Sequence, residues 1–256
     1  MAGFDLARRL KAGETVYAAW CFMGAPVVAE AIARDGISAA VLDMQHGLWD
    51  TASVIAGIGA VVHAGGAPVV RVPLDDFGFV SRALDFGAAA VIAPMINSAA
   101  DARKFAAVAK FPPLGERSWG PQRAMTLQGR TGTVDYLREA NDGTLTMAMI
   151  ETPMALSQVD SIAETPGIDA LFIGPYDLST SLSAGKAQDV AAPEVERAID
   201  QIGAAASKAG KIAGIYCSDP ARARAMVKRG FRFVTVGGDV GYLRDGLAAQ
   251  LKALKG

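Results

Sequence analysis

Eight short apolar runs, spaced along almost the whole chain and separated by stretches of helical pattern, constrain the fold more than any other feature. The runs cover residues 15–22, 38–44, 67–72, 89–96, 145–151, 168–174, 211–217 and 231–237. They are apolar on both faces, as parallel strands covered by helices must be. Several of the intervening amphipathic stretches end in glycine, a common signal for the C-terminus of a helix. The alternation predicts a parallel sheet with a helix after each strand.

Eight evenly distributed β/α units favour a closed (β/α)₈ barrel, with an open doubly wound sheet as the alternative. An α/β barrel reaches the length of this chain as one domain, so we expect a single domain over residues 1–256. Two long segments, 111–144 and 178–193, interrupt the alternation, and long loops in compact domains are usually functional or interfacial. An amphipathic helix is expected over 242–255.

Composition excludes several classes of protein. The net charge of −1 lacks the basic excess of a nucleic-acid-binding protein. Cys21 and Cys217 are the only cysteines, too few for a disulfide framework or a zinc knuckle, and they fit an intracellular setting. Neither a signal peptide nor an uninterrupted run of 18 apolar residues is found. We therefore expect a cytoplasmic protein that binds neither nucleic acid nor membrane.

Two acidic residues each follow an apolar run. Glu151 ends the fifth run, and Asp177 comes after a Gly-Pro turn that follows the sixth. Carboxylates at the carboxyl ends of barrel strands lie where active sites gather. Because the chain has only two histidines and no paired cysteines, the two acids favour a hard, oxygen-ligated cation over zinc or iron. The alternative is that each acid caps or begins a helix.

The same ends of other strands add Trp20, Asp43, His46 and Arg71 to the candidates. An arginine that ends an apolar strand needs an anionic partner, either a protein acid or a substrate carboxylate. His46 is either a proton carrier near neutral pH or a structural histidine, and Trp20 is either a core residue or a substrate contact. The Gly-Gly-Asp sequence at 237–239 is either a phosphate-binding turn or a plain tight turn.

These side chains suit metal-assisted chemistry on a 2-oxo acid. Glu151 and Asp177 would hold a divalent ion such as Mg²⁺ or Mn²⁺ and leave positions open for the carboxylate and ketone oxygens of the substrate. Arg71 would neutralise the developing oxyanion, and His46 would carry the proton. Lys211 begins the seventh strand, at the wrong end of the barrel, which argues against Schiff-base chemistry.

Six motifs, in this order, resemble those of the HpcH/HpaI family of metal-dependent pyruvate aldolases. They are LDMQHGLWD from Leu42, VVRVP from Val69, RALDFGA from Arg82, IAPMI from Ile92, IET from Ile150 and FIGPYDLS from Phe172. The resemblance implies a (β/α)₈ barrel that reversibly cleaves 4-hydroxy-2-oxo acids to pyruvate, or hydroxypyruvate, and an aldehyde. It further implies a divalent metal, Mg²⁺ or Mn²⁺ with Co²⁺ as an alternative. It also implies a homohexamer, a trimer of dimers with exchanged C-terminal helices.

Residue by residue, the resemblance makes Glu151 and Asp177 the metal ligands, His46 the general base and Arg71 the stabiliser of the enolate. Asp85 matches the acid that raises the basicity of the histidine, reaching it from elsewhere in the site or across an interface. Asp43 matches an acid beside the metal-bound water. The expected substrate contacts are Trp20, Arg71, Met149, Gly174, Pro175 and Tyr176.

Several positions depart from the family pattern. Gln45 replaces a glutamate, Met149 replaces a glutamine that bonds the substrate, and Tyr176 replaces a small residue. The loop around Arg117 and Trp119 lacks the usual Arg-Gly pair. These differences concern the pocket for the electrophile. Two alternatives remain for the function: a CoA-thioester lyase of the citrate or malyl-CoA lyase type, and a non-catalytic barrel that binds an acidic metabolite.

Overall fold

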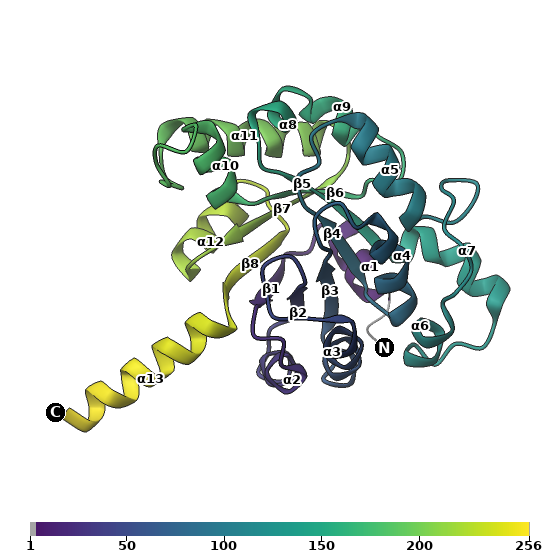
Figure 1. Ribbon diagram of the computed structural model, residues 1–256, viewed down its shortest axis with the longest axis horizontal. Coiled ribbons are helices and arrows are strands. Elements are labelled where there is room, and N and C mark those ends of the chain that lie inside the picture. The colour runs from purple at the N-terminus through teal and green to yellow at the C-terminus, as the bar shows by residue number, and fades with distance from the viewer. Residues whose placement is uncertain (1–3, 256) are drawn as a thin grey trace.

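The computed structural model describes residues 4–255 and confirms the closed barrel, whose strands lie at the centre of Figure 1. Within these residues eight parallel strands pair in sequence order, and β1 closes on β8. The strands are β1 (Val16–Cys21), β2 (Ala39–Asp43), β3 (Ala67–Arg71), β4 (Ala90–Ala93), β5 (Leu145–Ile150), β6 (Ala170–Ile173), β7 (Ile212–Cys217) and β8 (Phe233–Gly238). Residues 1–3 and 256 of the expected domain lie outside the described residues.

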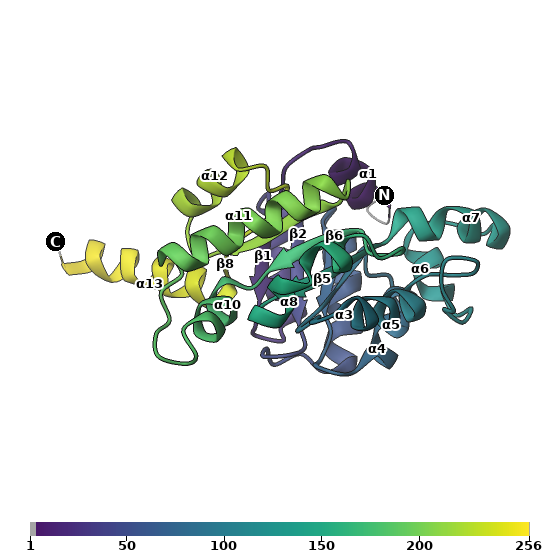
Figure 2. The ribbon, with the colours of Figure 1, turned by 90° about the horizontal axis from the view of Figure 1, so that it is seen from above.

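Helices surround the barrel on its outer side (Figure 2). They are α1 (Asp5–Lys11), α2 (Pro26–Arg34), α3 (Thr51–His63), α4 (Phe77–Phe86), α5 (Ala99–Ala109), α6 (Gln122–Leu127), α7 (Thr133–Gly143), α8 (Pro153–Ser157), α9 (Val159–Ala163), α10 (Pro175–Leu182), α11 (Pro193–Lys208), α12 (Pro220–Lys228) and α13 (Asp239–Lys255). None of the helices within residues 4–255 is long and apolar enough to cross a bilayer.

Apolar side chains form two layers of core. Val41 and Phe172 belong to a cluster inside the barrel, whereas their neighbours Leu42 and Leu171 belong to a cluster between the strands and the helices. Consecutive residues of one strand divide in this way because their side chains point to opposite faces. Both faces of each strand are therefore buried, which explains the continuous apolar runs in the sequence.

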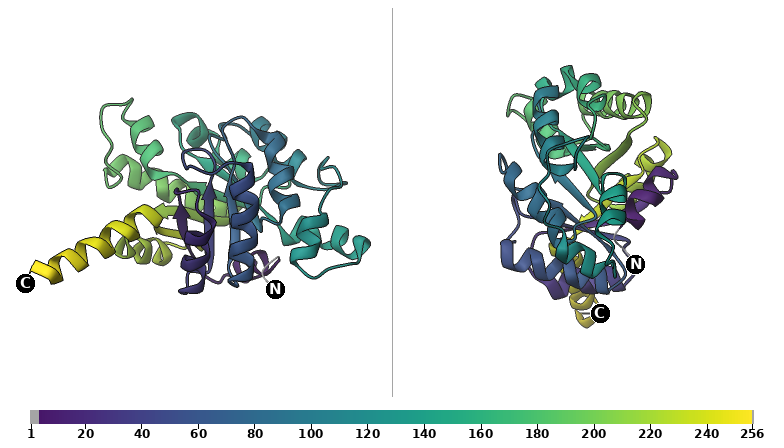
Figure 3. Two further views of the ribbon diagram at one scale, coloured as in Figure 1. Left: turned by 60° about the horizontal axis from the view of Figure 1, so that its bottom comes forward. Right: turned by 90° about the vertical axis from the view of Figure 1, so that its right-hand side faces the viewer.

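The prediction of a long loop over residues 111–144 is wrong, because α6 and α7 lie within it. Pro121 and Gly132 stand at the N-caps of these two helices, so the proline and glycine mark helix starts. The expected strand 89–96 is also shorter than predicted, since β4 ends at Ala93 directly before Pro94. Both α6 and α7 lie at the opposite side of the molecule from α13 (Figures 1 and 3).

Helix α13 leaves the barrel at the carboxyl end of β8 and projects away from it (Figures 1, 2 and 3). The expected C-terminal helix is confirmed, although it begins at Asp239. All of its residues from 241 to 255 are exposed. The exposed residues include four leucines at helical spacing: Leu243, Leu247, Leu251 and Leu254.

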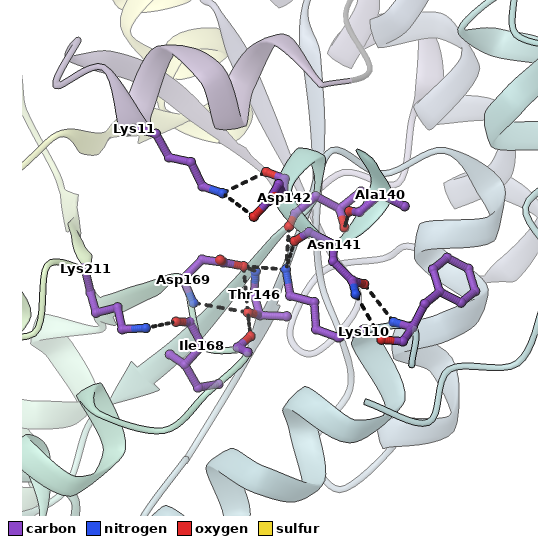
Figure 4. A network of polar contacts seen from close by, with 12 residues as sticks. Lys11, Lys110, Ala140, Asn141, Asp142, Thr146, Ile168, Asp169 and Lys211 are labelled. Carbon is purple, nitrogen blue, oxygen red and sulfur yellow. Dashed lines mark hydrogen bonds and ion pairs between the residues drawn. The ribbon is translucent and has the colours of Figure 1, made fainter. Parts of the chain in front are cut away.

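A polar network joins several elements at the amino ends of β5 and β6 (Figure 4). The Nζ atom of the buried Lys110 donates to the carbonyl oxygens of Asn141 and Thr144 and to Asp169 Oδ2, each at 2.7 Å. The Thr146 backbone N–H also donates to Asp169 Oδ2, at 2.9 Å. Burial lowers the pKa of Lys110, and the charge of Asp169 opposes this effect. The network lies at the opposite end of the strands from Glu151, so its role is structural.

We expect Lys110→Met to lower the free energy of unfolding by about 3–5 kcal/mol, because it leaves Asp169 and two carbonyl groups without their partner. Denaturant unfolding followed by circular dichroism measures the change. Lys104→Met, at an exposed position of α5, is the matched control and should change stability by about 0.5 kcal/mol or less. Equal stability of the two variants would contradict a structural role of the network.

Candidate active site

A cavity of about 240 Å³ lies at the carboxyl ends of the strands. Its lining includes eight residues expected from the sequence: Trp20, His46, Arg71, Met149, Gly174, Pro175, Tyr176 and Asp177. Phe22, Phe172 and Tyr216 complete it. The closed barrel brings these side chains together from β1, β2, β3, β5, β6 and β7, since parallel strands all end at one rim.

The two acids lie next to each other at this rim. Glu151 directly follows β5 and is buried, and its Oε2 atom accepts a hydrogen bond from the Met95 backbone N–H at 3.0 Å. Asp177 lies in the first turn of α10. Burial raises the pKa of Glu151 to about 7; the Met95 bond opposes this rise, and the neighbouring Asp177 adds to it. The idea that Glu151 caps a helix is wrong, because Thr152 caps α8.

The acid pair fits a divalent cation. A buried carboxylate beside a second carboxylate is stabilised when a cation lies between them. Among residues 4–255 no group of three or more His, Cys, Asp or Glu side chains could hold a metal, so the protein would supply two ligands and leave the other positions open. The absence of a side chain at Gly174 lets the Glu151 carboxylate lie against the backbone of this residue, since a Cβ atom there would lie 2.3 Å from Glu151 Oε1.

Arg71 is anchored by a buried ion pair with Asp43. The two residues are direct register partners on β3 and β2, which places their side chains side by side. Arg71 Nε donates to Asp43 Oδ1 at 2.7 Å, and Nη2 donates to Oδ2 at 2.6 Å. The Trp20 indole N–H donates to Oδ2 at 3.0 Å, and the Arg71 guanidinium carbon lies 4.8 Å from the centroid of that ring. Arg71 Nη1 forms no hydrogen bond with residues 4–255 and is free to bind a substrate oxygen.

Asp43 itself lies under Arg71 and does not line the cavity. Burial alone would favour its neutral form, but the bonds from Arg71 and Trp20 outweigh that effect and hold the pKa of Asp43 below its usual value. The carboxylate therefore stays ionised and fixes the guanidinium in one orientation. Its expected place beside a metal-bound water remains a prediction.

His46 lies on the exposed side of the cavity, in the turn after β2. Its backbone N–H donates to Asp43 Oδ1 at 3.3 Å, which positions the residue. The imidazole forms no hydrogen bond with residues 4–255, so both ring nitrogens are open to a substrate or a partner.

Asp85 lies away from the cavity of its own chain. It belongs to the last turn of α4, and eight residues of helix separate it from Phe77 by about 12 Å. Its carboxylate pairs with the buried Arg117 at 2.6 Å. Asp85 is therefore not among the residues that line this cavity, and its action on His46, within the site or across an interface, remains a prediction.

The Gly-Gly-Asp sequence joins the end of β8 directly to the start of α13, and its acid already accepts from the nearby backbone donors. The buried Asp239 accepts from the N–H groups of Phe22 (3.0 Å), Met23 (2.9 Å) and Val240 (2.8 Å). A phosphate would have to compete with this carboxylate for those groups. The geometry argues against the phosphate-binding interpretation, and in place of the expected tight turn β8 passes directly into α13.

Besides Phe22 and Phe172, two contributors were not predicted from the sequence. Tyr216 is the penultimate residue of β7, inside the sequence IYC, and reading the end of the seventh strand as well as the others would have found it. Met95 contributes its backbone N–H from a left-handed conformation (φ 55°) that few non-glycine residues adopt. Only the Pro94 before it hinted at a change of backbone direction.

Residues 17–246 match the model of the HpcH/HpaI aldolase/citrate lyase family. The chain belongs to this family, as the sequence motifs suggested. A protein of Rhizorhabdus wittichii named hydroxypyruvate/pyruvate aldolase is 37% identical over 231 residues, which cover 90% of each chain.

A protein of Salmonella gallinarum named 2-keto-3-deoxy-L-rhamnonate aldolase is 32% identical over 247 residues, covering 96% of this chain and 91% of its own. The crystal structure of an HpcH/HpaI aldolase/citrate lyase family protein from Burkholderia cenocepacia superposes with a TM-score of 0.89 at 34% identity, covering 98% of this chain and 99% of its own. These similarities confirm the expectation of an enzyme, a carbon–carbon lyase of the aldolase type.

Proposed function

We propose that this protein is a divalent-metal-dependent aldolase that reversibly cleaves 4-hydroxy-2-oxo acids to pyruvate, or hydroxypyruvate, and an aldehyde. One observation carries the proposal: the buried Glu151 lies beside Asp177, which lines a small cavity together with His46 and the anchored Arg71. In cleavage the C3–C4 bond breaks and its electron pair stays with the donor fragment as an enolate. The C4 hydroxyl loses its proton, C4 becomes the aldehyde carbon, and C3 gains a proton to give pyruvate.

Glu151 and Asp177 would hold the cation, Mg²⁺ or Mn²⁺ with Co²⁺ as the alternative. When bound, it would supply Lewis-acid stabilisation of negative charge on the ketone oxygen of the substrate. Arg71 would donate from Nη1 to the same developing charge, in an orientation that Asp43 fixes in advance. His46 would take the proton from the C4 hydroxyl and return one to C3.

The start of α10 supports a site for the substrate carboxylate. Gly174 is the N-cap of this helix and Pro175 its first residue, so the next backbone N–H groups, those of Tyr176 and Asp177, have no partner within the helix. N–H groups at a helix N-terminus and the helix dipole favour a bound anion. The carboxylate of the oxo acid would thus lie beside the cation ligands.

The decisive experiment measures pyruvate release from a panel of 4-hydroxy-2-oxo acids with and without EDTA, and again after Mg²⁺ or Mn²⁺ is restored. We expect release to stop with EDTA and to return with the metal. Activity that resists the chelator, or a lysine adduct trapped by borohydride, would contradict the mechanism. Retention on immobilised CoA would favour the thioester-lyase alternative. Stabilisation by 2-oxo acids without turnover would favour the non-catalytic barrel.

We also propose a homohexamer, a trimer of dimers in which α13 packs on a neighbouring subunit. The exposed leucine stripe supports this assembly, because a soluble monomer rarely keeps such a stripe uncovered. Within such an assembly Asp85 could approach His46 of another subunit. A cytoplasmic location remains a prediction.

The stripe gives a direct test of assembly. Replacing Leu247 and Leu251 together by Glu places two charges in the proposed contact, so we expect the mass in solution to fall below that of the hexamer. Size-exclusion chromatography with light scattering measures it. Ala249→Glu adds a charge on the opposite face of the same exposed helix and should leave the assembly intact. A double variant with the wild-type mass would show that α13 does not mediate assembly.

A further inference from the structure

Four aromatic side chains form a continuous row along one wall of the cavity. Phe172 and Trp20 are buried, with ring centroids 5.8 Å apart. Tyr216 meets Trp20 edge-to-face at 5.6 Å, and Tyr176 meets Tyr216 in the same manner at 5.9 Å. Tyr176 is 38% exposed, so the row leads from the barrel interior to the mouth of the cavity. We refer to these four residues as the aromatic row.

Permanent positive charge is scarce in the cavity. Among the described lining residues Arg71 is the only arginine, and there is no lysine. Arg71 is already bound to Asp43 and lies near Glu151 and Asp177, on the side where the oxo acid would bind. Asp177 adds a negative charge near the mouth. Apart from His46 and the cation proposed at Glu151 and Asp177, the lining therefore offers no positive charge to a second anionic group.

The geometry points to an uncharged, short aldehyde as the partner of the oxo acid, selected by the aromatic row with Tyr176 and Tyr216 as the specificity-determining residues. This inference rests on the proposed function. The aldehyde would enter through the mouth and lie between the enolate carbon and the two tyrosines. A carboxylate or phosphate group on the aldehyde would lose its hydrating water against the aromatic rings without gaining a positively charged partner. This desolvation costs binding free energy.

Two further observations bear on the size and the polarity of this aldehyde. The cavity of about 240 Å³ must hold both reactants, yet it lies below the range of roughly 300–1,000 Å³ typical of sites for drug-sized ligands. The hydroxyl groups of Tyr176 and Tyr216 form no hydrogen bond with residues 4–255, so they can bond a neutral oxygen of the aldehyde. Short apolar, aromatic or hydroxylated aldehydes fit this environment.

The test compares aldehydes that differ only in charge, with pyruvate as the donor and Mg²⁺ present. The pairs are butanal with succinic semialdehyde, and benzaldehyde with 4-carboxybenzaldehyde. We expect kcat/KM to be at least about tenfold higher for the neutral member of each pair, a difference that one unfavourable contact can produce. Equal or higher values for the charged members would overturn the inference.

A separate measurement tests the proposed function itself. Exchange of the pyruvate methyl protons for deuterium in D₂O, followed by NMR, reports enolate formation and needs no aldehyde. Absence of exchange with Mg²⁺ or Mn²⁺ would contradict the proposed function. Normal exchange with no preference between the paired aldehydes would contradict only the specificity inference.

Two variants at the mouth test the charge argument. Tyr176→Lys places a cation beside the aldehyde, and Tyr176→Gln is its neutral control. We expect the ratio of kcat/KM for succinic semialdehyde to that for butanal to be at least about tenfold higher in the lysine variant. Each kcat/KM value is divided by the rate at which the same variant exchanges the methyl protons of pyruvate. This division corrects for damage to the pyruvate site. Equal ratios in the two variants would contradict the charge argument.

The role of ring bulk is tested with longer aldehydes. Tyr176→Ala and Tyr216→Ala widen the mouth, so each should raise the ratio of octanal to butanal activity by about tenfold. Tyr17→Ala is the control, since Tyr17 is also 38% exposed but lies outside the cavity, and it should leave the ratio unchanged. A ratio within twofold of wild type in both cavity variants would show that these tyrosines do not select the aldehyde.

Discussion

Glu151→Gln should abolish metal-dependent cleavage while making the metal-free protein more stable. The substitution removes one of two charged ligands, so we expect kcat/KM to fall by at least about 10³-fold. The gain in stability follows from the environment, because burial and Asp177 both raise the pKa of Glu151, to about 7. Without a cation the ionised carboxylate is destabilised in the folded state, and glutamine removes that charge at nearly constant volume.

The stability of the metal-free wild-type protein should fall as the pH rises. An acid whose pKa is higher in the folded than in the unfolded state binds more protons when folded, so stability falls as pH rises between the two values. For Glu151 this window runs from 4.5, the ordinary value, to about 7. In EDTA the wild-type protein should therefore lose about 3 kcal/mol relative to Glu151→Gln across the window, with little further change above it.

Thermal unfolding with and without Mg²⁺ measures both effects. The wild-type protein should gain about 2.7 kcal/mol at a metal concentration 100 times the Kd, whereas Glu151→Gln should gain little. Glu164→Gln, at an exposed position, is the control and should behave as wild type. A Glu151→Gln variant that keeps both its metal-induced stabilisation and its activity would remove Glu151 from the cation site.

Loss of Arg71 is the second change with a large expected effect. Arg71→Ala removes the donor to the developing oxyanion, and removal of one such donor costs about 10²–10³-fold in kcat. It also leaves the buried Asp43 without its partner, which costs about 3–5 kcal/mol of stability. A drop in activity alone would not separate these two effects.

A double variant separates them. Arg71→Met combined with Asp43→Asn removes both buried charges, so the fold should recover much of its stability while turnover stays low. Arg71→Lys keeps the charge but cannot reproduce the two-pronged bond to Asp43, so it should fall between wild type and Arg71→Ala. Steady-state kinetics beside denaturant unfolding gives both quantities. Recovery of turnover in the double variant would exclude a catalytic role for Arg71.

Much of the site could be predicted from the sequence because a closed parallel barrel reduces the problem to one rule: residues at the carboxyl ends of the strands share a rim. His46, Arg71 and Asp177 follow from this rule alone. Tyr216 satisfies the same rule but was not predicted, because an aromatic residue near a strand end resembles a core residue. The rule predicts where a side chain lies but not what it does in the reaction.

Three-dimensional pairing was harder to predict. Asp43 and Arg71 were both recognised, yet their ion pair depends on the register of β2 against β3, which the sequence does not state. Asp85 was assigned by resemblance, and a resemblance between sequences does not specify which subunit a side chain serves. The helices α6 and α7 were missed because glycine and proline signal both a loop and a helix start.

Asp239 has a mechanical consequence beyond the junction of β8 and α13. Its carboxylate ties the end of β8 to the backbone after β1, and α13 starts at this residue. The helix has 17 residues and is about 26 Å long, so a tilt of roughly 10° at its base moves its far end by about 4 Å. A small change in the orientation of α13 at the buried Asp239 carboxylate therefore becomes a larger displacement at the far end of the helix. Substitutions at 239 should redirect the leucine stripe without replacing any of its leucines.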